Sequence, residues 1–224
     1  MSSVKKRTYD QYCGLARALD VLGERWTLLV VRELLIGPKR FSDLMEGLPG
    51  IVANALSARL KSLEADGLVT KRRLPPPAAS TVYELTERGR GLDPAVSELI
   101  RWGVDLLGEP APGVRFRPGW LVTTMRALFD RELAAGITRT YRLQVDDEVF
   151  TARIEDGDIE VSQGEDGDAD LSLTTDSDAV LALASGELSA EEAIEHGRIA
   201  VDHGDPAEAV AFVGMIRLPA AATA

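Results

Sequence analysis

The segment from Gly50 to Val69, GIVANALSARLKSLEADGLV, constrains the fold of this chain more than any other segment. Its apolar residues recur with the period of a helix. One face of that helix comprises Val52, Leu56, Leu60 and Leu63, and the opposite face comprises Asn54, Ser57, Ala58 and Lys61. Gly67 favours the left-handed conformation that ends helices, and Leu68-Val69-Thr70 begins a short strand. We therefore expect a helix that packs on one side and presents small or polar residues on the other.

The flanking segments predict a helical domain with a β-ribbon. Three helices are expected before the amphipathic one: a first around residues 16–22, then WTLLVVRELLIG (26–37) and FSDLMEGL (41–48). After it, residues 70–74 and 81–86 predict two short strands. They bracket the proline-rich tip PPPAAS, which cannot itself hold a strand ladder. This tip and its strands are expected to form a wing.

Residues 86–107 predict a further helix with a polar start. Its apolar positions are Val96, Leu99, Ile100, Val104 and Leu107. A stripe of this kind suits packing against another surface. We expect it to form the seam of a homodimer.

Several stretches of the first half form a family pattern. They are Tyr12-Cys13, residues 22–26 (LGERW), residues 37–41 (GPKRF), residues 59–64 (RLKSLE), residues 67–69 (GLV) and residues 82–89 (VYELTERG). Over residues 8–107 the chain resembles the HxlR-type winged helix-turn-helix regulators of bacteria, although Glu24-Arg25 stands where those regulators commonly carry a glycine-lysine pair. The resemblance implies a DNA-binding and dimerisation domain over residues 1–107, a double-stranded DNA operator as partner, and a role in transcriptional regulation.

The polar face of the amphipathic helix and the wing are then the expected DNA contacts. Asparagine suits adenine, lysine suits guanine or phosphate, and small alanines let a helix approach base edges. The predicted contact residues are Lys39, Arg40, Ala53, Asn54, Ser57, Ala58, Arg59, Lys61, Arg72, Arg73, Ser80 and Thr81. In an isolated helix such a face would be an ordinary solvated surface. Arg59 has two open interpretations: it reaches a phosphate, or it braces the domain through a carboxylate.

Cys13 is the one cysteine of the chain and lies where some HxlR-type regulators carry a redox-sensing cysteine. An inert buried thiol is the alternative. Reactivity requires exposure and a lowered pKa, and Arg17 is the only cation that the local sequence supplies nearby. A sole cysteine can form a disulfide only with another subunit or a small thiol.

The charge is distributed unevenly between the two halves. Residues 1–108 contain 16 basic and 13 acidic residues, whereas residues 109–224 contain 9 basic and 23 acidic ones, which gives the net charge of −11. Basic clusters occur at residues 5–7, 39–40 and 71–73, where a winged helix would meet phosphates. We expect the first half to approach DNA and the acidic half to be repelled from it.

Composition predicts a cytoplasmic protein of two domains of about a hundred residues each. No apolar stretch reaches the roughly 18 residues that span a bilayer, and no signal-peptide pattern begins the chain. A single cysteine and two histidines argue against a structural metal and against a disulfide framework. We expect no metal, no cofactor and no membrane partner.

The second half predicts an α+β domain. Prolines and glycines at residues 108–113 suggest a linker over 108–114, followed by a domain over 115–217 and a flexible tail over 218–224. A helix is expected over residues 119–135. Strict alternation then predicts strands around residues 141–145, 150–154, 159–161 and 171–173, separated by acidic turns, and a last short strand at 199–201 between helices. An antiparallel sheet with one solvated face follows from this pattern.

Three stretches carry a second resemblance: residues 175–177 (TDS), residues 183–188 (LASGEL) and the run from Ala193 to Asp205. Together with the acidic-turn meander, they are similar to the sterol carrier protein type two fold. Such domains enclose an apolar tunnel, which implies a hydrophobic small-molecule or lipid ligand. The candidate ligand-binding residues are Trp120, Met125, Phe129, Phe150 and Phe212. Each of them could equally be ordinary core.

No catalytic constellation is present in the sequence. The acidic run starting at Asp166 fails as a calcium-binding loop, since Leu171 and Ser177 occupy the positions that need glycine and glutamate. Neither a nucleophile motif nor a phosphate-binding glycine loop occurs. We therefore expect a non-enzymatic regulator. The alternative is a second domain that only supports structure or oligomerisation, with regulation by Cys13 oxidation or without any ligand.

Overall fold

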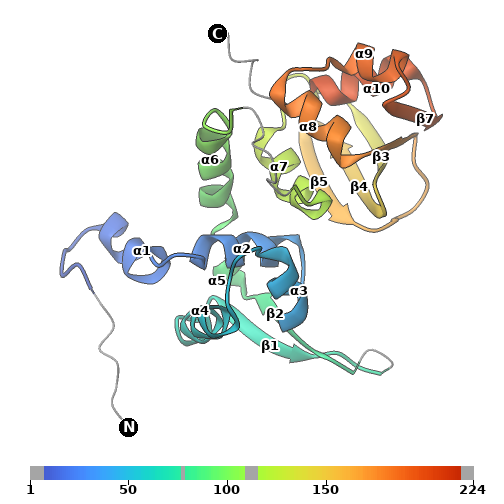
Figure 1. The fold of residues 1–224 in the computed structure, drawn as a ribbon. Coiled ribbons are helices and arrows are strands. Elements are labelled where there is room, and N and C mark those ends of the chain that lie inside the picture. Colours follow the sequence, from blue (N-terminus) through green and yellow to red (C-terminus); the bar gives the residue numbers. More distant parts are fainter. Residues whose placement is uncertain (1–7, 77–78, 109–115, 218–224) are drawn as a thin grey trace. The chain divides into compact units, whose positions relative to one another are not determined.

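The computed structural model describes residues 8–76, 79–108 and 116–217. The chain divides into two compact units, residues 1–96 and 97–224 (Figure 1). The expected fold class is confirmed: a helical unit with a two-stranded ribbon precedes a unit of helices and a five-stranded sheet. The basic cluster at residues 5–7, residues 109–114 of the expected linker and the expected tail at 218–224 lie outside the described residues.

The first unit follows the element order that the sequence predicts. Its elements are α1 (Gly14–Leu22), α2 (Thr27–Ile36), α3 (Phe41–Gly47), α4 (Ala53–Ala65), β1 (Val69–Arg73), β2 (Thr81–Leu85) and α5 (Glu87–Arg90), and α6 (Asp93–Val104) crosses into the second unit. Strands β1 and β2 pair antiparallel from Val69 opposite Leu85 to Arg73 opposite Thr81. We call this β1–β2 ribbon the wing.

Helix α2 is central to the first unit because it packs against α3, α4 and β2. Its sequence, TLLVVRELLI, is apolar on nearly every side, which is typical of a helix enclosed by other elements. Val30, Val31 and Leu34 are buried on it. The buried leucines of α3 and α4 complete the same core, so the two helices that follow α2 are held by one apolar cluster.

The helix expected over residues 86–107 is in fact two helices. The Thr86 hydroxyl accepts a hydrogen bond from the backbone N–H of Gly89 and so caps the short α5, and a turn at Gly91 separates α5 from α6. Helix α6 ends at Val104. Of the apolar residues on and after α6, Val96 is buried; the large ones that remain exposed are Leu99, Trp102, Leu106 and Leu107.

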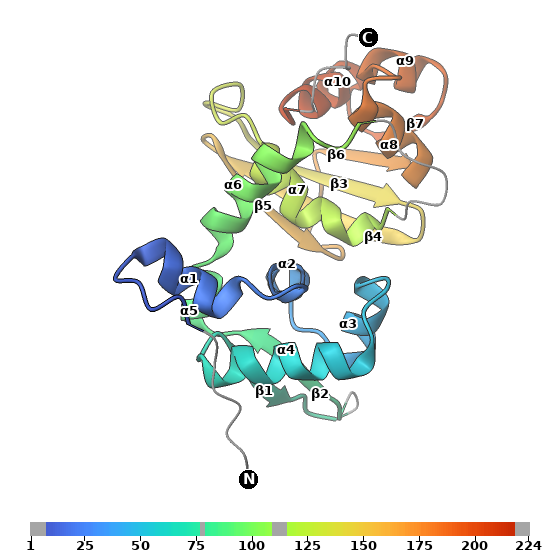
Figure 2. The same ribbon diagram turned by 60° about the vertical axis from the view of Figure 1, so that its left-hand side comes forward.

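The second unit contains the mixed helices and strands that alternation predicts. Its elements are η1 (Pro118–Trp120), α7 (Leu121–Leu128), β3 (Thr138–Val145), β4 (Glu148–Glu155), β5 (Asp158–Gln163), β6 (Leu171–Thr175), α8 (Ser177–Ser185), α9 (Ala190–Glu195), β7 (Ile199–His203) and α10 (Pro206–Gly214). Helix α7 lies beside β5, whereas α9 and α10 lie beside β7 and β6 (Figure 2).

The sheet has the order β5-β4-β3-β6-β7. The pairs β3–β4, β4–β5 and β6–β7 are antiparallel, as alternation and tight acidic turns suggest. The central pair β3–β6 is parallel, with Tyr141 opposite Leu171. Alternation fixes which side chains share a face but not which strands become neighbours, so the sequence pattern did not reveal this pair.

One face of the sheet is apolar and the other is polar, as expected. Tyr141, Ala152 and Val161 lie side by side on the buried face, in register across three strands. The ring of Phe212 on α10 stacks on Tyr141 with centroids 4.2 Å apart. Helix α10 therefore covers the apolar face of the sheet.

The helix expected over residues 119–135 is shorter than predicted, because α7 ends at Leu128. The next residue, Phe129, is extended and forms a bridge with Ile216 near the end of the described chain. The Asp130 carboxylate then accepts backbone N–H groups of Glu132 and Leu133 and pairs with Arg217 at 2.7 Å. Pairing with this distant segment replaces the last turns of the predicted helix.

Substitution of Gly89 by alanine tests the packing between α5 and the base of the wing. An added methyl group would clash with the backbone carbonyl oxygen of Leu68, which cannot move away as a flexible side chain would. We expect a loss of about 1–3 kcal/mol in the free energy of unfolding, measured by urea denaturation. Gly103→Ala is the matched control, because its methyl group would meet no atom within 4 Å. Equal unfolding midpoints for the two variants would contradict the proposed clash.

Candidate functional site

Helix α4 is anchored by three leucines that are almost completely buried. Leu56, Leu60 and Leu63 have exposed fractions of 0, 2 and 1%. The predicted fourth member of this stripe, Val52, is not part of it: Val52 is the extended residue before the helix and is 65% exposed. Gly67 adopts φ +69° and ends the helix as expected, and the backbone N–H of Leu68 donates to the carbonyl of Leu63.

The opposite side of α4 is exposed as predicted. We call this surface the reading face; it comprises Ala53, Asn54, Ser57, Ala58 and Lys61. The wing is next to it, because β1 packs against α4 and the Lys71 ammonium reaches Glu64 at 2.9 Å (Figure 2). The structure thus brings the helix and the wing candidates together on one unit.

The two basic residues before α3 are also attached to the wing and to their own helix. Lys39 and Tyr83 exchange backbone hydrogen bonds of 3.0 and 2.8 Å, so this loop forms an isolated antiparallel bridge with β2. The Arg40 guanidinium pairs with Asp43 at 3.1 Å, and its backbone N–H donates to the same carboxylate. That ion pair raises the pKa of Arg40 and helps to lower the pKa of Asp43, whose partial burial has the opposite effect.

Arg59 braces the domain in this structure. Its guanidinium lies 3.6 Å from the Glu24 carboxylate, and its side chain is only 22% exposed. Glu24 belongs to the Glu24-Arg25 pair that precedes Trp26. The guanidinium of Arg25 lies over the ring of Trp26, 5.2 Å from its centroid. The turn before α2 is therefore tied to α4 by the carboxylate of Glu24.

The wing candidates differ in what they contact. The Nε of Arg72 donates to the Glu84 carboxylate at 2.9 Å, whereas Arg73 is exposed at the end of β1 and has no ion pair among the described residues. Ser80 immediately precedes β2 and Thr81 is its first residue; the backbone carbonyl of Ser80 accepts a hydrogen bond from the backbone N–H of Leu74. Sequence spacing did not reveal that the two adjacent arginines would be held differently.

Cys13 is exposed, so the alternative of a buried thiol is excluded. It is the residue before α1, and backbone N–H groups of Ala16 and Leu15 lower the pKa of its thiol. Arg17, the expected nearby cation, pairs with Asp20 at 2.9 Å.

The candidate ligand residues of the second unit differ in burial. Met125, Phe150 and Phe212 are buried, whereas Trp120 and Phe129 are partly exposed. Tyr141 was not among the predicted ligand-binding residues, although it lies in the same apolar layer. Burial, together with nearby Glu208, raises the pKa of Tyr141 to about 12, so its hydroxyl stays neutral.

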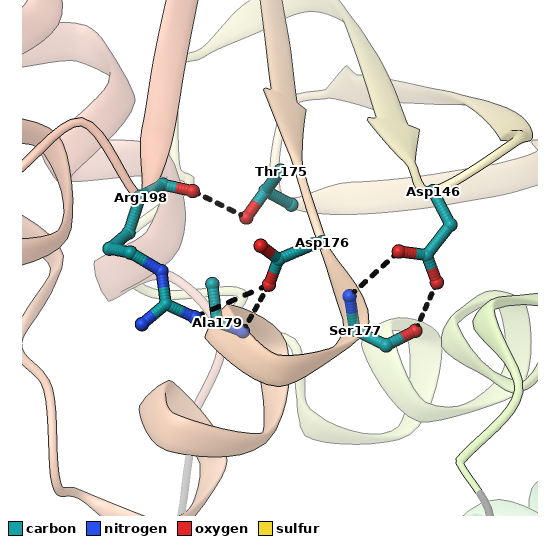
Figure 3. A network of polar contacts seen from close by, with 6 residues as sticks. All are labelled: Asp146, Thr175, Asp176, Ser177, Ala179 and Arg198. Carbon is teal, nitrogen blue, oxygen red and sulfur yellow. Dashed lines mark hydrogen bonds and ion pairs between the residues drawn. The ribbon is translucent and has the colours of Figure 1, made fainter.

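A polar network fixes the end of the sheet from which α8 begins (Figure 3). The Asp176 carboxylate accepts the backbone N–H of Ala179 at 2.7 Å, which caps α8, and it also pairs with Arg198 at 3.3 Å. On the other side, the hydroxyl of Thr175 donates to the backbone carbonyl of Arg198. Strands β6 and β7 are thus linked beyond their last paired residues.

The same network reaches the end of β3. Asp146, which has a positive φ of 52°, accepts both the backbone N–H and the hydroxyl of Ser177. Its own backbone N–H donates to the carbonyl of Thr175. The residues of this network bond to one another, and we therefore interpret the network as a support for the start of α8.

The acidic turns likewise use their carboxylates within the domain. Asp170 accepts the backbone N–H of Thr140, Asp156 accepts that of Gly136, and Asp166 pairs with Arg153. Across the described parts of the chain, no group of three or more metal-ligating side chains comes together. In those same parts, no helix is both long and apolar enough to cross a membrane.

An anchored helix with an exposed polar face, next to a basic two-stranded wing, defines a winged helix-turn-helix DNA-binding protein. Comparison with known families agrees. Residues 21–110 match the HxlR-like helix-turn-helix family, and residues 125–217 match the SCP-2 sterol transfer family. The chain belongs to the HxlR-like helix-turn-helix family and carries a second domain of the SCP-2 type.

Individual relatives support this assignment. The regulator YvaP of Bacillus subtilis is 37% identical over 89 residues, which are 40% of this chain and 82% of YvaP. YodB of the same organism, named as an HTH-type transcriptional regulator, is 37% identical over 97 residues, 43% of this chain and 86% of YodB. The solved structure of reduced YodB is 35% identical with a TM-score of 0.38, covering 45% of this chain and 99% of that one. The family match and the sequence identity with YvaP and YodB show that this chain is a DNA-binding transcriptional regulator.

Substitutions of Asp176 test the support of α8. Asp176→Ala removes the helix cap and should cost about 1 kcal/mol of unfolding free energy, whereas Asp176→Asn keeps an acceptor for the Ala179 N–H and should cost less. Thermal or urea unfolding measures both.

The same residue predicts a pH dependence. The Ala179 hydrogen bond and the Arg198 pair hold the pKa of Asp176 below its usual range. A lowered pKa in the folded state means that this stabilisation is complete above the unfolded pKa of about 3.9 and is lost as the pH falls through the folded value. The stability difference between the wild type and Asp176→Asn should therefore shrink on acidification below about pH 4. A difference that grows on acidification would contradict this assignment.

Proposed function

We propose that the protein binds near-palindromic operator DNA as a homodimer through the reading face and the wing, and that a hydrophobic molecule in the second domain changes its affinity for DNA. The observation that carries the DNA-binding mode is the reading face itself, which three buried leucines hold outward beside a basic wing. The proposal assigns DNA binding and dimerisation to residues 1–107 and ligand binding to residues 115–217.

The chemistry of the predicted contact set supports major-groove binding by α4. Asn54 offers the donor and acceptor pair that matches adenine, and Lys61 suits guanine or a phosphate. Ala53 and Ala58 have small side chains, so the helix can approach base edges closely. Wing residues contact the backbone or the minor groove in this proposal, which positions the protein more than it selects sequence.

Exposed apolar side chains support dimerisation. Leu99 and Trp102 on α6 are 50 and 70% exposed, and Leu106 and Leu107 follow them. Side chains of this size seldom stay in water together unless they meet a partner. A two-fold dimer would place two reading helices about one DNA turn apart, as operators with two half-sites require.

The SCP-2 family match supports a hydrophobic ligand in the second domain. Its buried apolar layer contains Met125, Phe150 and Phe212, and Tyr141 adds a hydroxyl that stays neutral. A ligand changes DNA affinity only if it binds the DNA-bound and free forms unequally. In the proposed coupling, α6 and α7 carry ligand occupancy to the spacing of the reading helices.

A second mode of regulation is supported by Cys13. Its thiol is exposed and its pKa is lowered, and both properties favour oxidation. In this alternative the second domain only supports structure or oligomerisation, and DNA affinity responds to a disulfide between subunits or with a small thiol.

DNA binding is tested with duplexes from upstream of the coding region, titrated at several salt concentrations. We expect salt-sensitive binding with two protomers per site. Asn54→Ala and Lys61→Ala should each weaken binding by roughly 1–3 kcal/mol, and Lys61→Ala should also reduce the salt slope by about one per protomer. Arg88→Ala, which removes an exposed cation outside the predicted contact set, is the control. If the wild type binds the upstream duplexes no more tightly than a random duplex, the proposal of an operator in that region is rejected.

Ligand coupling is tested by adding palmitic acid or cholesterol, delivered from cyclodextrin, to the same titration. If the second domain takes such molecules, the saturating probe shifts operator affinity, and operator DNA shifts probe affinity by the same factor. Empty cyclodextrin is the control. Probe binding with equal operator affinity in both states would support the structural alternative and reject coupling.

A further inference from the structure

The basic residues of the predicted DNA contact set fall into two groups. Three arginines are held by carboxylates: Arg40 by Asp43 at 3.1 Å, Arg59 by Glu24 at 3.6 Å and Arg72 by Glu84 at 2.9 Å. The other three, Lys39, Lys61 and Arg73, form no ion pair within the described part of the chain. Half of the basic residues in the predicted contact set are thus already paired with a carboxylate of the protein.

In the wing, strand geometry separates the two groups. Adjacent residues on a strand point to opposite faces, so Arg72 and Arg73 cannot share a face. Arg73 shares the face of Lys71, which reaches Glu64 on α4. Arg72 shares the other face with Glu84. Thr70 pairs opposite Glu84, and Arg72 lies two residues after Thr70 and therefore on the same face. The unpaired arginine is therefore on the side of the wing that faces α4.

On α4, helical geometry makes the same separation. Arg59 and Lys61 are two residues apart, which places them on different sides of the helix. Arg59 is directed to the turn before α2, where Glu24 holds it with 22% of its side chain exposed. Lys61 belongs to the reading face and is exposed.

We propose that Glu24 and Glu84 are counter-charges built into the DNA-binding surface. Each carboxylate holds one arginine, so that this arginine positions the surface, and the phosphate contacts are made by Lys39, Lys61 and Arg73. The proposal deepens the DNA-binding mode given above and rests on it. A phosphate that approached Arg72 would also approach the Glu84 carboxylate and be repelled by it. The carboxylates thereby limit the salt-dependent, sequence-independent part of binding and leave a larger share to base contacts.

The test measures affinity for a random duplex and for the operator as a function of salt. Glu84→Gln and Glu24→Gln keep the side-chain size and remove the counter-charge. Each should raise random-duplex affinity, by roughly threefold to tenfold at low salt, and steepen the salt slope by about 0.9 per protomer as one arginine becomes available to phosphate. Lys61→Ala and Arg73→Ala should each make the slope shallower by a similar amount.

Double variants decide whether the arginine carries the effect. In Glu84→Gln/Arg72→Ala and Glu24→Gln/Arg59→Ala, the gained affinity and slope should disappear. Glu187→Gln, which removes an exposed carboxylate of the second unit, controls for the change in net charge. Circular dichroism and thermal unfolding of each variant establish that it is folded.

The outcomes separate this inference from the proposed function. If the wild type binds no duplex, operator binding itself fails. If the wild type binds but Glu84→Gln and Glu24→Gln behave like Glu187→Gln, the counter-charge role is overturned while DNA binding stands. A gain that persists in the double variants overturns it as well, because the carboxylates would then act through the general field of the protein.

Discussion

The packing of Leu56, Leu60 and Leu63 against the core of the first unit is the interaction on which the DNA-binding surface depends. Each buried leucine contributes about 1.5–3 kcal/mol relative to an exposed one, which is far more than any surface ion pair on the same helix. Because these side chains share one face of α4, their burial also fixes the rotation of the helix about its axis. The outward direction of Asn54 and Lys61 is a consequence of that rotation.

Local sequence patterns predicted the elements well where one periodicity was sufficient. The end of α4 at Gly67, the strands of the wing and the strands of the second sheet all follow from spacing and turn chemistry. Two of the misses, the length of α7 and the parallel strand pair, occur where distant segments compete with local preference. Helix α7 stops early because the extended residue after it pairs with Ile216, and the parallel pair β3–β6 joins strands that other elements separate in the chain.

The candidate contact residues were chosen by residue type, and the sequence did not predict which of them would form ion pairs. In the sequence, Arg72 and Arg73 are equivalent neighbours and Arg59 has two open interpretations. Only the fold shows that Glu84 lies beside Arg72 and Glu24 beside Arg59. Ion pairs between segments depend on the register of the strands and on the rotation of the helix. The spacing of residues within one segment carries no information on either. Tyr141 was missed for a related reason, since its significance comes from the ring of Phe212 on a different element.

The pairing of the α7 terminus with residues 215–217 has a consequence for the order in which the protein forms. The backbone of Asp130 donates to the Met215 carbonyl, and that of Arg217 donates to the Leu128 carbonyl. The ribosome makes these partners at opposite ends of the second unit, and domains tend to fold as they emerge, N-terminal first. The winged helix can therefore fold on the nascent chain. In the second unit, the hydrogen bonds between the α7 terminus and residues 215–217 cannot form until residue 217 has left the ribosome.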